Sequence, residues 1–304
     1  MLVLSAANVS EGRRRPVIDA IVAAACACPA VRLLDLHSDP DHNRSVISVA
    51  GPPAAMWDAL FALIQGAALH IDMGRHEGQH PRIGAADVVP FTPLQGSTLA
   101  QCRDLARGLC ARVGRELQLP VYLYGAAARV PEARQLADIR RGGYEGLRIA
   151  IGGDEQRRPD CGPSIMGRAG AVAIGARETL IAWNVWLDTE DVHVAGRIAH
   201  RIRASGGGLP ALQALGMQVA GRAQVSMNLT DYRRTGLAAV MDALRREAGR
   251  EGISLYGSEL VGLIPRAALD AAAGCDLQLL KSPEEQVLER RLEETGLVRS
   301  DRLQ

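Results

Sequence analysis

Residues 31–50 read VRLLDLHSDPDHNRSVISVA and contain two strand-like runs with no helical segment between them. Residues 31–36 and 44–50 are rich in apolar and β-branched residues, and the polar run that joins them carries Asp, Pro and Asn, which is typical of a turn. Parallel neighbours need a crossover of a dozen or more residues, so two strands joined this closely pair as a hairpin. The stretch argues against a purely parallel, doubly wound sheet.

Helical segments flank this stretch on both sides. A helix is expected over 14–28 before it, and another begins at Pro52 and Pro53 after it, because proline suits the first helical turn. The second half of the chain shows the same mixture of helices, hairpins and crossovers. We therefore expect an α+β fold of two ferredoxin-like α/β sandwich subdomains, residues 1–178 and 179–304, with a substrate cleft between them.

Three later segments have weaker patterns. Residues 125–170 show little periodicity and are expected to be mostly irregular, with a short helix near 132–140. The glycine-rich run 205–208 is expected to be a loop that leads to a strand at 223–229. The last helix is expected to begin at Ser282 and to end at Gly296.

Composition limits the function classes. Lys+Arg number 35 and Asp+Glu 34, so no general field attracts nucleic acid or an anionic membrane. Aromatic residues make up 3%, which argues against stacking platforms for single strands. No run of about twenty apolar residues is present, and the six cysteines do not form the repeated C-x2-C pairs of a zinc ribbon. We expect a cytoplasmic protein that binds no nucleic acid, membrane or metal.

Residues 71–91, IDMGRHEGQHPRIGAADVVPF, are the candidate for chemistry. Glycine and proline make this run a shaped loop that leads into a buried strand, and such loops often display functional side chains. His80 can accept and donate a proton near neutral pH, although a histidine that only bonds the loop backbone is the alternative. Arg44, Arg75 and Arg82 lie in or near the loop and could bind a carboxylate, or could be solvated surface groups.

Other polar residues of the loop leave further alternatives open. His70, His76 and His80 could form a three-histidine metal site, but the glycine and proline residues oppose a helix there and no HExxH pattern is present. Asp72 and Asp87 could orient a histidine or cap a turn. A second glycine-rich run at 162–170 has neither a Walker lysine nor a dinucleotide fingerprint, so its backbone amides either meet a flat heterocycle or form an ordinary surface loop.

Taken together, these motifs resemble the formiminotransferase domain of the formiminotransferase-cyclodeaminase family, in its stand-alone form. The resemblance spans nearly the whole chain. It is carried by residues 8–12, 43–44, 51–53, 71–91, 121–125, 127–129, 162–164, 175–177, 184 and 257–263.

The resemblance implies folate-dependent transfer of the formimino group from N-formimino-L-glutamate to N5 of tetrahydrofolate, a step of histidine degradation. It implies that His80 is the catalytic acid and base, that the chain forms a homodimer, and that tetrahydrofolate is the co-substrate without a metal. Donor binding is assigned to Arg44, Arg75, Arg82 and His37. The folate-contacting loop falls on Gly162, Pro163, Ser164, Ile165, Met166, Gly167, Arg168, Ala169 and Gly170.

Two departures from the family pattern keep other functions open. His37 stands where many relatives carry an aspartate, and the loop 162–170 lacks the aromatic residues that relatives place there. A related formyl or one-carbon transfer between folate and glutamate, or action on another amidine, is the first alternative. A folate-binding paralogue without catalysis is the second, and a metal-dependent hydrolase is the third.

Overall fold

The computed structural model describes residues 1–129 and 136–298, and it divides the chain into two compact units, Met1–Arg177 and Glu178–Gln304. Each unit has its own hydrophobic core. Phe91 is among the largest fully buried side chains of the first core, and Trp183 is among the largest of the second. The two units are described separately below.

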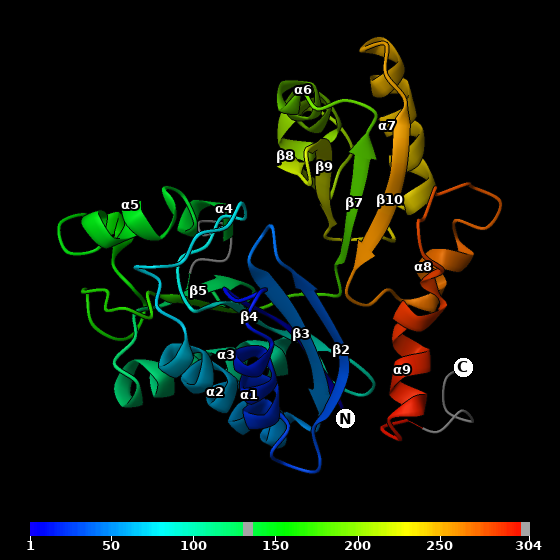
Figure 1. Ribbon diagram of the computed structural model, residues 1–304. Coiled ribbons are helices and arrows are strands. Elements are labelled where there is room, and N and C mark those ends of the chain that lie inside the picture. The colour runs from blue at the N-terminus through cyan, green and yellow to red at the C-terminus, as the bar shows by residue number, and fades with distance from the viewer. Residues whose placement is uncertain (130–135, 299–304) are drawn as a thin grey trace. The chain divides into compact units, whose positions relative to one another are not determined.

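The first unit contains a six-stranded mixed sheet with the strand order β2-β3-β1-β4-β6-β5 (Figure 1). Its first part runs β1 (Val3–Val9), α1 (Arg15–Ala25), β2 (Arg32–Asp39), β3 (Arg44–Gly51), α2 (Pro53–His70) and β4 (Ala86–Pro93). This βαββαβ order with antiparallel β2-β3-β1-β4 pairing is ferredoxin-like.

An extension of the first unit adds two parallel strands to this sheet. It consists of α3 (Leu99–Glu116), β5 (Val121–Gly125), α4 (Leu136–Ile139), α5 (Gly143–Ala150), the 3-10 turn η1 (Glu155–Arg157) and β6 (Val172–Ala176). β6 lies between β4 and β5 and pairs in parallel with both. Strand β4 is therefore interior, and all of its residues except Pro93 are buried.

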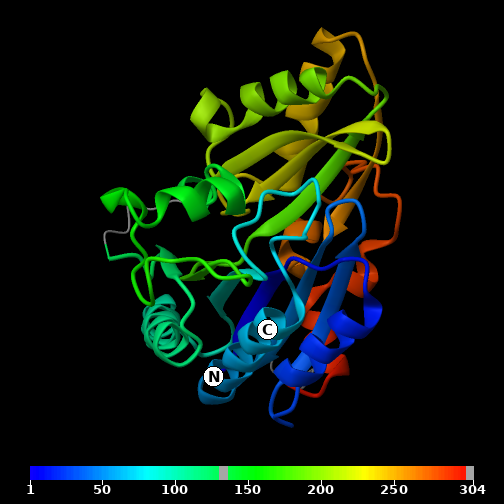
Figure 2. The same ribbon diagram turned by 60° about the vertical axis from the view of Figure 1, so that its left-hand side comes forward.

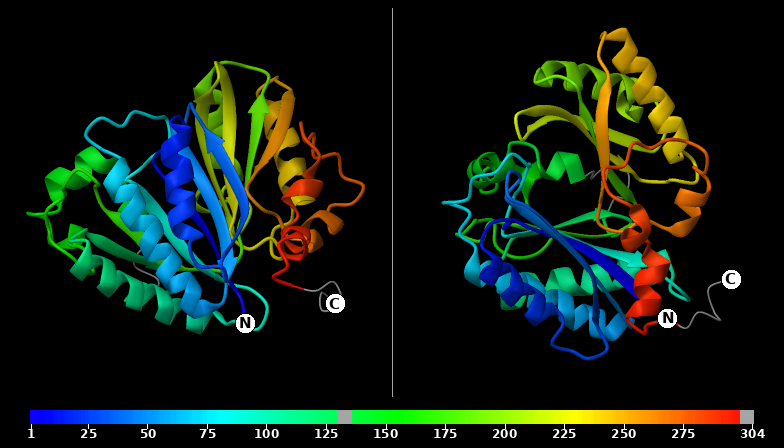
Figure 3. Two further views of the ribbon diagram at one scale, coloured as in Figure 1. Left: turned by 60° about the horizontal axis from the view of Figure 1, so that its bottom comes forward. Right: turned by 45° about the vertical axis from the view of Figure 1, so that its right-hand side comes forward.

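Helices α1, α2 and α3 cover one face of this sheet (Figure 3). Alternation along β3 places Ile47 and Val49 in the core under these helices, so Arg44 and Val46 point to the opposite face. Helix α3 begins with a capping box, in which the Gln101 N–H donates to Thr98 Oγ1 at 3.2 Å and the Thr98 N–H donates to Gln101 Oε1 at 3.0 Å.

The second unit is a four-stranded antiparallel sheet of strand order β10-β7-β9-β8 (Figure 2). Its elements are β7 (Ile181–Leu187), α6 (Val192–Ile202), η2 (Ala204–Gly206), β8 (Leu212–Val219), β9 (Arg222–Leu229), α7 (Leu237–Arg250), β10 (Leu255–Val261), α8 (Arg266–Asp270), η3 (Pro283–Gln286) and α9 (Leu288–Glu294). The βαββαβ order from β7 to β10 is again ferredoxin-like, as the sequence predicted. Among the described residues, no helix is long and apolar enough to cross a membrane.

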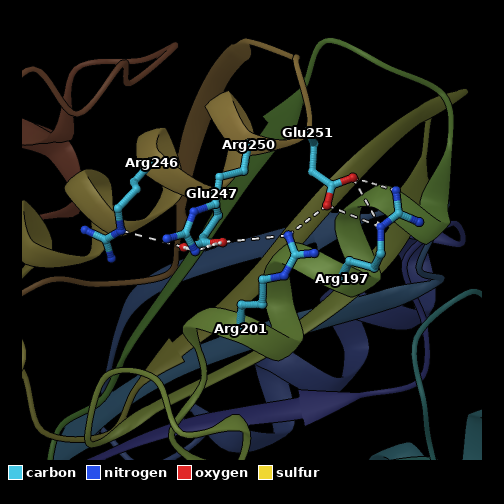
Figure 4. A network of polar contacts seen from close by, with 6 residues as sticks. All are labelled: Arg197, Arg201, Arg246, Glu247, Arg250 and Glu251. Carbon is cyan, nitrogen blue, oxygen red and sulfur yellow. Dashed lines mark hydrogen bonds and ion pairs between the residues drawn. The ribbon is translucent and has the colours of Figure 1, made fainter.

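The contact between α6 and α7 ends in an ion-pair network (Figure 4). Glu251, just after α7, pairs with Arg197 at 2.6 Å and with Arg201 at 2.7 Å, and both arginines come from α6. Glu247 of α7 is nearly buried and pairs with Arg250 at 2.9 Å. A buried carboxylate is costly unless it is paired, so these arginines allow two acidic residues at the helix interface.

Four details differ from the sequence-based expectations. β2 continues to Asp39, so His37 lies in a strand rather than in the turn. The segment 125–170 contains the helix α5 in addition to the short helix expected near 132–140, of which 136–139 forms α4 and 132–135 lies outside the described residues. β8 was missed because Gly216 interrupts its pattern, yet a side chain there would lie 2.3 Å from the Gly196 backbone nitrogen of α6. The last helix is broken at Val287, which forms a bridge with Ile264.

Candidate active site on the face of the first sheet opposite its helices

The loop 71–85, which carries His80, is fastened to the turn between β2 and β3. The side-chain amide of Asn43 donates to the Glu77 carbonyl at 2.9 Å. Gly78 lies so close to this turn that a Cβ would approach the His42 carbonyl oxygen to 2.3 Å. A residue with a side chain at position 78 would push the loop away from this turn, so glycine allows the loop to hold His80 close to the turn.

The other end of the loop is fastened to the glycine-rich segment 162–170. The Met73 N–H donates to the Arg168 carbonyl at 2.7 Å, and Gly84 forms an antiparallel bridge with Gly170. The structure thus brings together the two segments that the sequence singled out for catalysis and for folate binding.

His80 is held as a neutral imidazole beside a guanidinium group. Arg44 Nη1 lies 2.5 Å from His80 Nε2, and because arginine can only donate, Nε2 is the acceptor and Nδ1 carries the proton. Burial lowers the pKa of His80 well below its usual value, and the charges of Arg44, Arg140 and His42 lower it further. The backbone of Pro81 partly offsets these effects, without a well-formed hydrogen bond to the buried Nδ1.

A second guanidinium group, which the sequence did not identify, stands next to Arg44. Arg140 follows α4 and donates to Oδ2 of Asp87, which is 1% exposed and also accepts the Ile83 N–H at 2.8 Å. Burial lowers the pKa of Arg44 to about 10, and the charge of Arg140 adds to this effect against the opposing charges of Asp87 and Asp39. Two positive groups and one neutral imidazole therefore lie close together on the face of the sheet opposite helices α1, α2 and α3.

The family comparison adds an independent observation to this geometry. The formiminotransferase domain, N-terminal subdomain, matches residues 2–177, and the formiminotransferase domain matches residues 182–299.

The chain belongs to the formiminotransferase family.

Proteins that are similar over most of the chain carry related names. A glutamate formimidoyltransferase of Thermoplasma acidophilum is 45% identical over 293 residues, with 95% of this chain and 96% of that one covered. A glutamate formimidoyltransferase of Streptococcus pyogenes is 41% identical and covers 90% of this chain and 92% of its own length. A formimidoyltransferase-cyclodeaminase of Rattus norvegicus is 40% identical over 92% of this chain, which corresponds to 53% of the rat protein.

The other predicted donor-binding residues of this formiminotransferase have different surroundings. Arg82 donates to both oxygens of Glu145 at 2.9 and 2.7 Å and to His76 Nδ1 at 3.2 Å, so its donors are largely engaged. The side chain of Arg75 is exposed. His37 lies on β2, and it adds to the lowering of the pKa of His42 that burial causes. Of the three predicted arginines, Arg44 is the one that contacts His80.

A histidine metal site does not form in the described part of this formiminotransferase. His76 Nε2 donates to the Asn43 carbonyl at 2.9 Å, while its Nδ1 accepts from Arg82, so both ring nitrogens are engaged. Within residues 1–129 and 136–298, no group of three His, Cys, Asp or Glu side chains is placed to hold a metal ion.

The predicted folate segment has a firmly held base and an exposed tip. A Cβ at Gly162 would lie 2.0 Å from the Leu119 carbonyl oxygen, and Cys161 before it contacts Cys110 of α3 with 2.7 Å between the sulfur atoms. Ile165 is 76% exposed, and a side chain at Gly167 would meet open space. The tip can therefore approach a flat ring through backbone and apolar atoms.

A cavity of 750 Å³ lies elsewhere in the first unit, where it is lined by residues of β5, α4, α5 and η1. Its polar lining is largely paired internally. Arg157 donates to the carbonyls of Asp138 and Arg141, and Asp160 accepts the Leu123 N–H at 2.8 Å. The residues around it do not include His80, Arg44 or Arg140, so the cavity does not identify the catalytic position.

Proposed function

We propose that this chain is a glutamate formimidoyltransferase, which moves the formimino group from N-formimino-L-glutamate to N5 of tetrahydrofolate and releases L-glutamate. The observation that carries the proposal is a neutral imidazole, His80 of the loop 71–85, beside the guanidinium of Arg44 of β3. The two relatives named glutamate formimidoyltransferase, similar over nearly their full length, support the same reaction.

The reaction needs one group that first accepts and then donates a proton. N5 of tetrahydrofolate attacks the amidine carbon, and His80 takes the proton that leaves N5. The bond between this carbon and the glutamate nitrogen then breaks, and the imidazolium returns the proton to that nitrogen. A depressed pKa keeps His80 in the neutral form that starts this cycle. Acid and base catalysis of this kind contributes about 10²–10⁴-fold to the rate.

Holding both substrates in register is expected to contribute at least as much as the proton transfer. We assign the donor carboxylate to Arg44 and the folate ring to the exposed tip of 162–170. Both proposed binding positions lie in the first unit. The loop 71–85 contacts the segment 162–170 there, through Arg168 and Gly170.

The remaining features of the proposal concern the setting of the reaction. We propose that tetrahydrofolate is a co-substrate, that no metal takes part, and that the protein works in the cytoplasm as a homodimer without nucleic acid or membrane partners. The near-balanced charge supports the last point. Sedimentation equilibrium tests the dimer, and full activity after dialysis against a chelator tests the absence of a metal.

The experiment that tests the proposal follows formation of 5-formiminotetrahydrofolate from N-formimino-L-glutamate and tetrahydrofolate. We expect His80→Ala to lose two to four orders of magnitude in kcat, about the usual contribution of acid and base catalysis, and to keep tetrahydrofolate binding. His70→Ala is the matched control, because His70 is an exposed histidine at the end of α2. An inactive wild type would refute this donor, and an active His80→Ala variant would refute the role of His80.

One observation favours a second candidate, transfer of a formyl group from a neutral amide. His37 lies on the same face of the sheet as Arg44 by the register of β2 on β3, and a histidine there offers no fixed negative charge to a cationic amidine. If N-formyl-L-glutamate is the better donor, His37→Asp is expected to shift the preference toward N-formimino-L-glutamate. Equal donor preference in wild type and His37→Asp would remove this candidate.

A further inference from the structure

We propose that Arg140 and Arg44 together form a subsite for a substrate carboxylate, and that a bound carboxylate draws Arg44 away from His80 and exposes Nε2. The inference rests on the proposed function, in that the donor carries carboxylates, and it adds Arg140 as a residue that binds one of these carboxylates together with Arg44.

The first argument is the local charge. Arg44 and Arg140 each carry a positive charge, and Asp87 is the carboxylate that pairs with one of them, Arg140. No carboxylate in the described parts of the chain lies within ion-pair distance of Arg44. Asp39 acts on Arg44 only from a longer distance. A net positive charge at a largely buried position attracts an anionic group.

The second argument is the pair of donors without partners. Arg140 Nε is buried and has no hydrogen-bond partner among the described residues, and the same holds for His80 Nδ1. Buried polar groups are normally bonded, so each of these two donors indicates a missing acceptor. A carboxylate has two oxygens and several acceptor positions, which suits guanidinium groups of this geometry.

The third argument is the position of the Arg44 guanidinium. One of its N–H groups donates to His80 Nε2, which is the atom that must accept the proton from N5. A carboxylate carries the charge opposite to that of a guanidinium and can accept two parallel N–H···O bonds from it, whereas the neutral imidazole offers one acceptor, so a bound carboxylate outcompetes His80 for Arg44. The base is therefore covered in the empty site and exposed in the occupied one.

The groups that face His80 set the sign of the effect on its ionisation. Arg44 and His42 approach it from β3 and from the turn before it, and Arg140 approaches from the residue after α4 together with its partner Asp87 of β4. Each of the three cationic or ionisable nitrogen groups lowers the pKa of His80. A carboxylate between the two arginines offsets their charge, so its binding raises the pKa of His80.

The test uses L-glutamate, the expected product, as a probe with the full-length protein in the absence of folate. The pH titration of the His80 ring is followed by NMR, with and without saturating L-glutamate, and is assigned from the spectrum of His80→Gln. In wild type, the His80 pKa is expected to rise when L-glutamate binds. A pKa that stays or falls on binding, or no binding of L-glutamate at millimolar concentration, overturns the proposal.

The variants separate Arg140 from its neighbours. Arg140→Met alone would leave the buried Asp87 unpaired, so it is combined with Asp87→Asn, which keeps an acceptor for the Ile83 N–H. This double variant is expected to bind L-glutamate at least tenfold more weakly and to lose the shift in the His80 pKa. Arg141→Lys is the matched control and is expected to match wild type, because Arg141 is 76% exposed and pairs with Asp138.

A third variant guards against a double variant that fails to fold. Arg140→Lys keeps the charge and loses the planar fork, and it is expected to raise KM for the donor more than it lowers kcat. Unchanged KM in Arg140→Lys together with wild-type affinity for L-glutamate overturns the subsite. A wild type that binds L-glutamate with the expected rise of the pKa but makes no 5-formiminotetrahydrofolate keeps the subsite and refutes the proposed function, so the two failures are distinguishable.

Discussion

Replacement of Gly84 by alanine tests how the catalytic loop is joined to the glycine-rich segment. A Cβ at this position would lie 1.9 Å from the Ala171 carbonyl oxygen, where side chains essentially never come closer than 3.0 Å. The two backbones must therefore separate by about 1 Å, which breaks the hydrogen bonds from the Ala171 N–H to Ile83 at 3.0 Å and from the Ala85 N–H to Ala169 at 2.8 Å.

The cost follows from the buried groups that lose their partners. Each unsatisfied backbone group destabilises the folded protein by about 1–3 kcal/mol. Alanine also lowers the conformational entropy of the unfolded chain, which offsets about 0.4–1 kcal/mol of this loss. We expect Gly84→Ala to lose about 2–4 kcal/mol of unfolding free energy. Urea denaturation followed by far-UV circular dichroism measures the loss. Gly167→Ala is the control for stability, since a Cβ there meets no atom within 4 Å. Equal urea midpoints for both variants and wild type would refute the reasoning.

Three further predictions concern protonation and oxidation. Histidines of the first unit have lowered pKa values, so the unfolded chain takes up protons at a higher pH than the folded chain. The free energy of unfolding is therefore expected to fall as pH falls below about 6.5, by up to about 1.4 kcal/mol per pH unit for each proton. His80→Asn should make this dependence on pH less steep, and an unchanged slope contradicts the explanation. Hydrogen bonds from two arginines of α6 lower the pKa of Glu251 to about 2, so its stabilising effect is present above about pH 4.5 and is lost as pH falls toward 2. Glu251→Gln should therefore lower the thermal midpoint at pH 7 but not at pH 2, where equal losses at both pH values would count against the ion pairs. Hydrogen peroxide should oxidise Cys110 and Cys161, whose sulfur atoms are in contact, to a disulfide, while the peroxide is reduced to water. The protein should then lose about 2 Da in mass. If both thiols can still be alkylated after peroxide treatment and unfolding, the predicted disulfide does not form.

The sequence predicted the elements whose patterns are local. The hairpin around residues 31–50 and the helices on either side of it were found because apolar runs alternate with clear breakers. The loop of His80 was identified as non-helical from its glycines and prolines. β8 was missed because Gly216 looks like a strand breaker. Glycine is required there because a Cβ would lie 2.3 Å from the Gly196 backbone nitrogen of α6, a contact that no local pattern reveals.

The candidate site was only partly accessible to sequence reasoning for the same physical reason. The motif placed His80 and Arg44 in the site, but nothing in the run Arg140-Arg141 tells which arginine turns inward. Arg140 is distinguished by its contact with Asp87, which is 53 positions earlier in the chain. The engagement of Arg82 by Glu145 likewise depends on a contact across 63 positions. Such pairings arise from tertiary packing and leave no signature in residue spacing.

The place of β6 between β4 and β5 has a consequence for synthesis on the ribosome. β4 and β5 are made early, yet they cannot complete the sheet until residues 172–176 emerge, about 50 residues after β5. At typical elongation rates this interval lasts roughly 3–10 s, during which both strands present unpaired edges. Unpaired edges are templates for pairing with another chain. Nascent chains of this length are therefore the stage at which the protein most needs a chaperone.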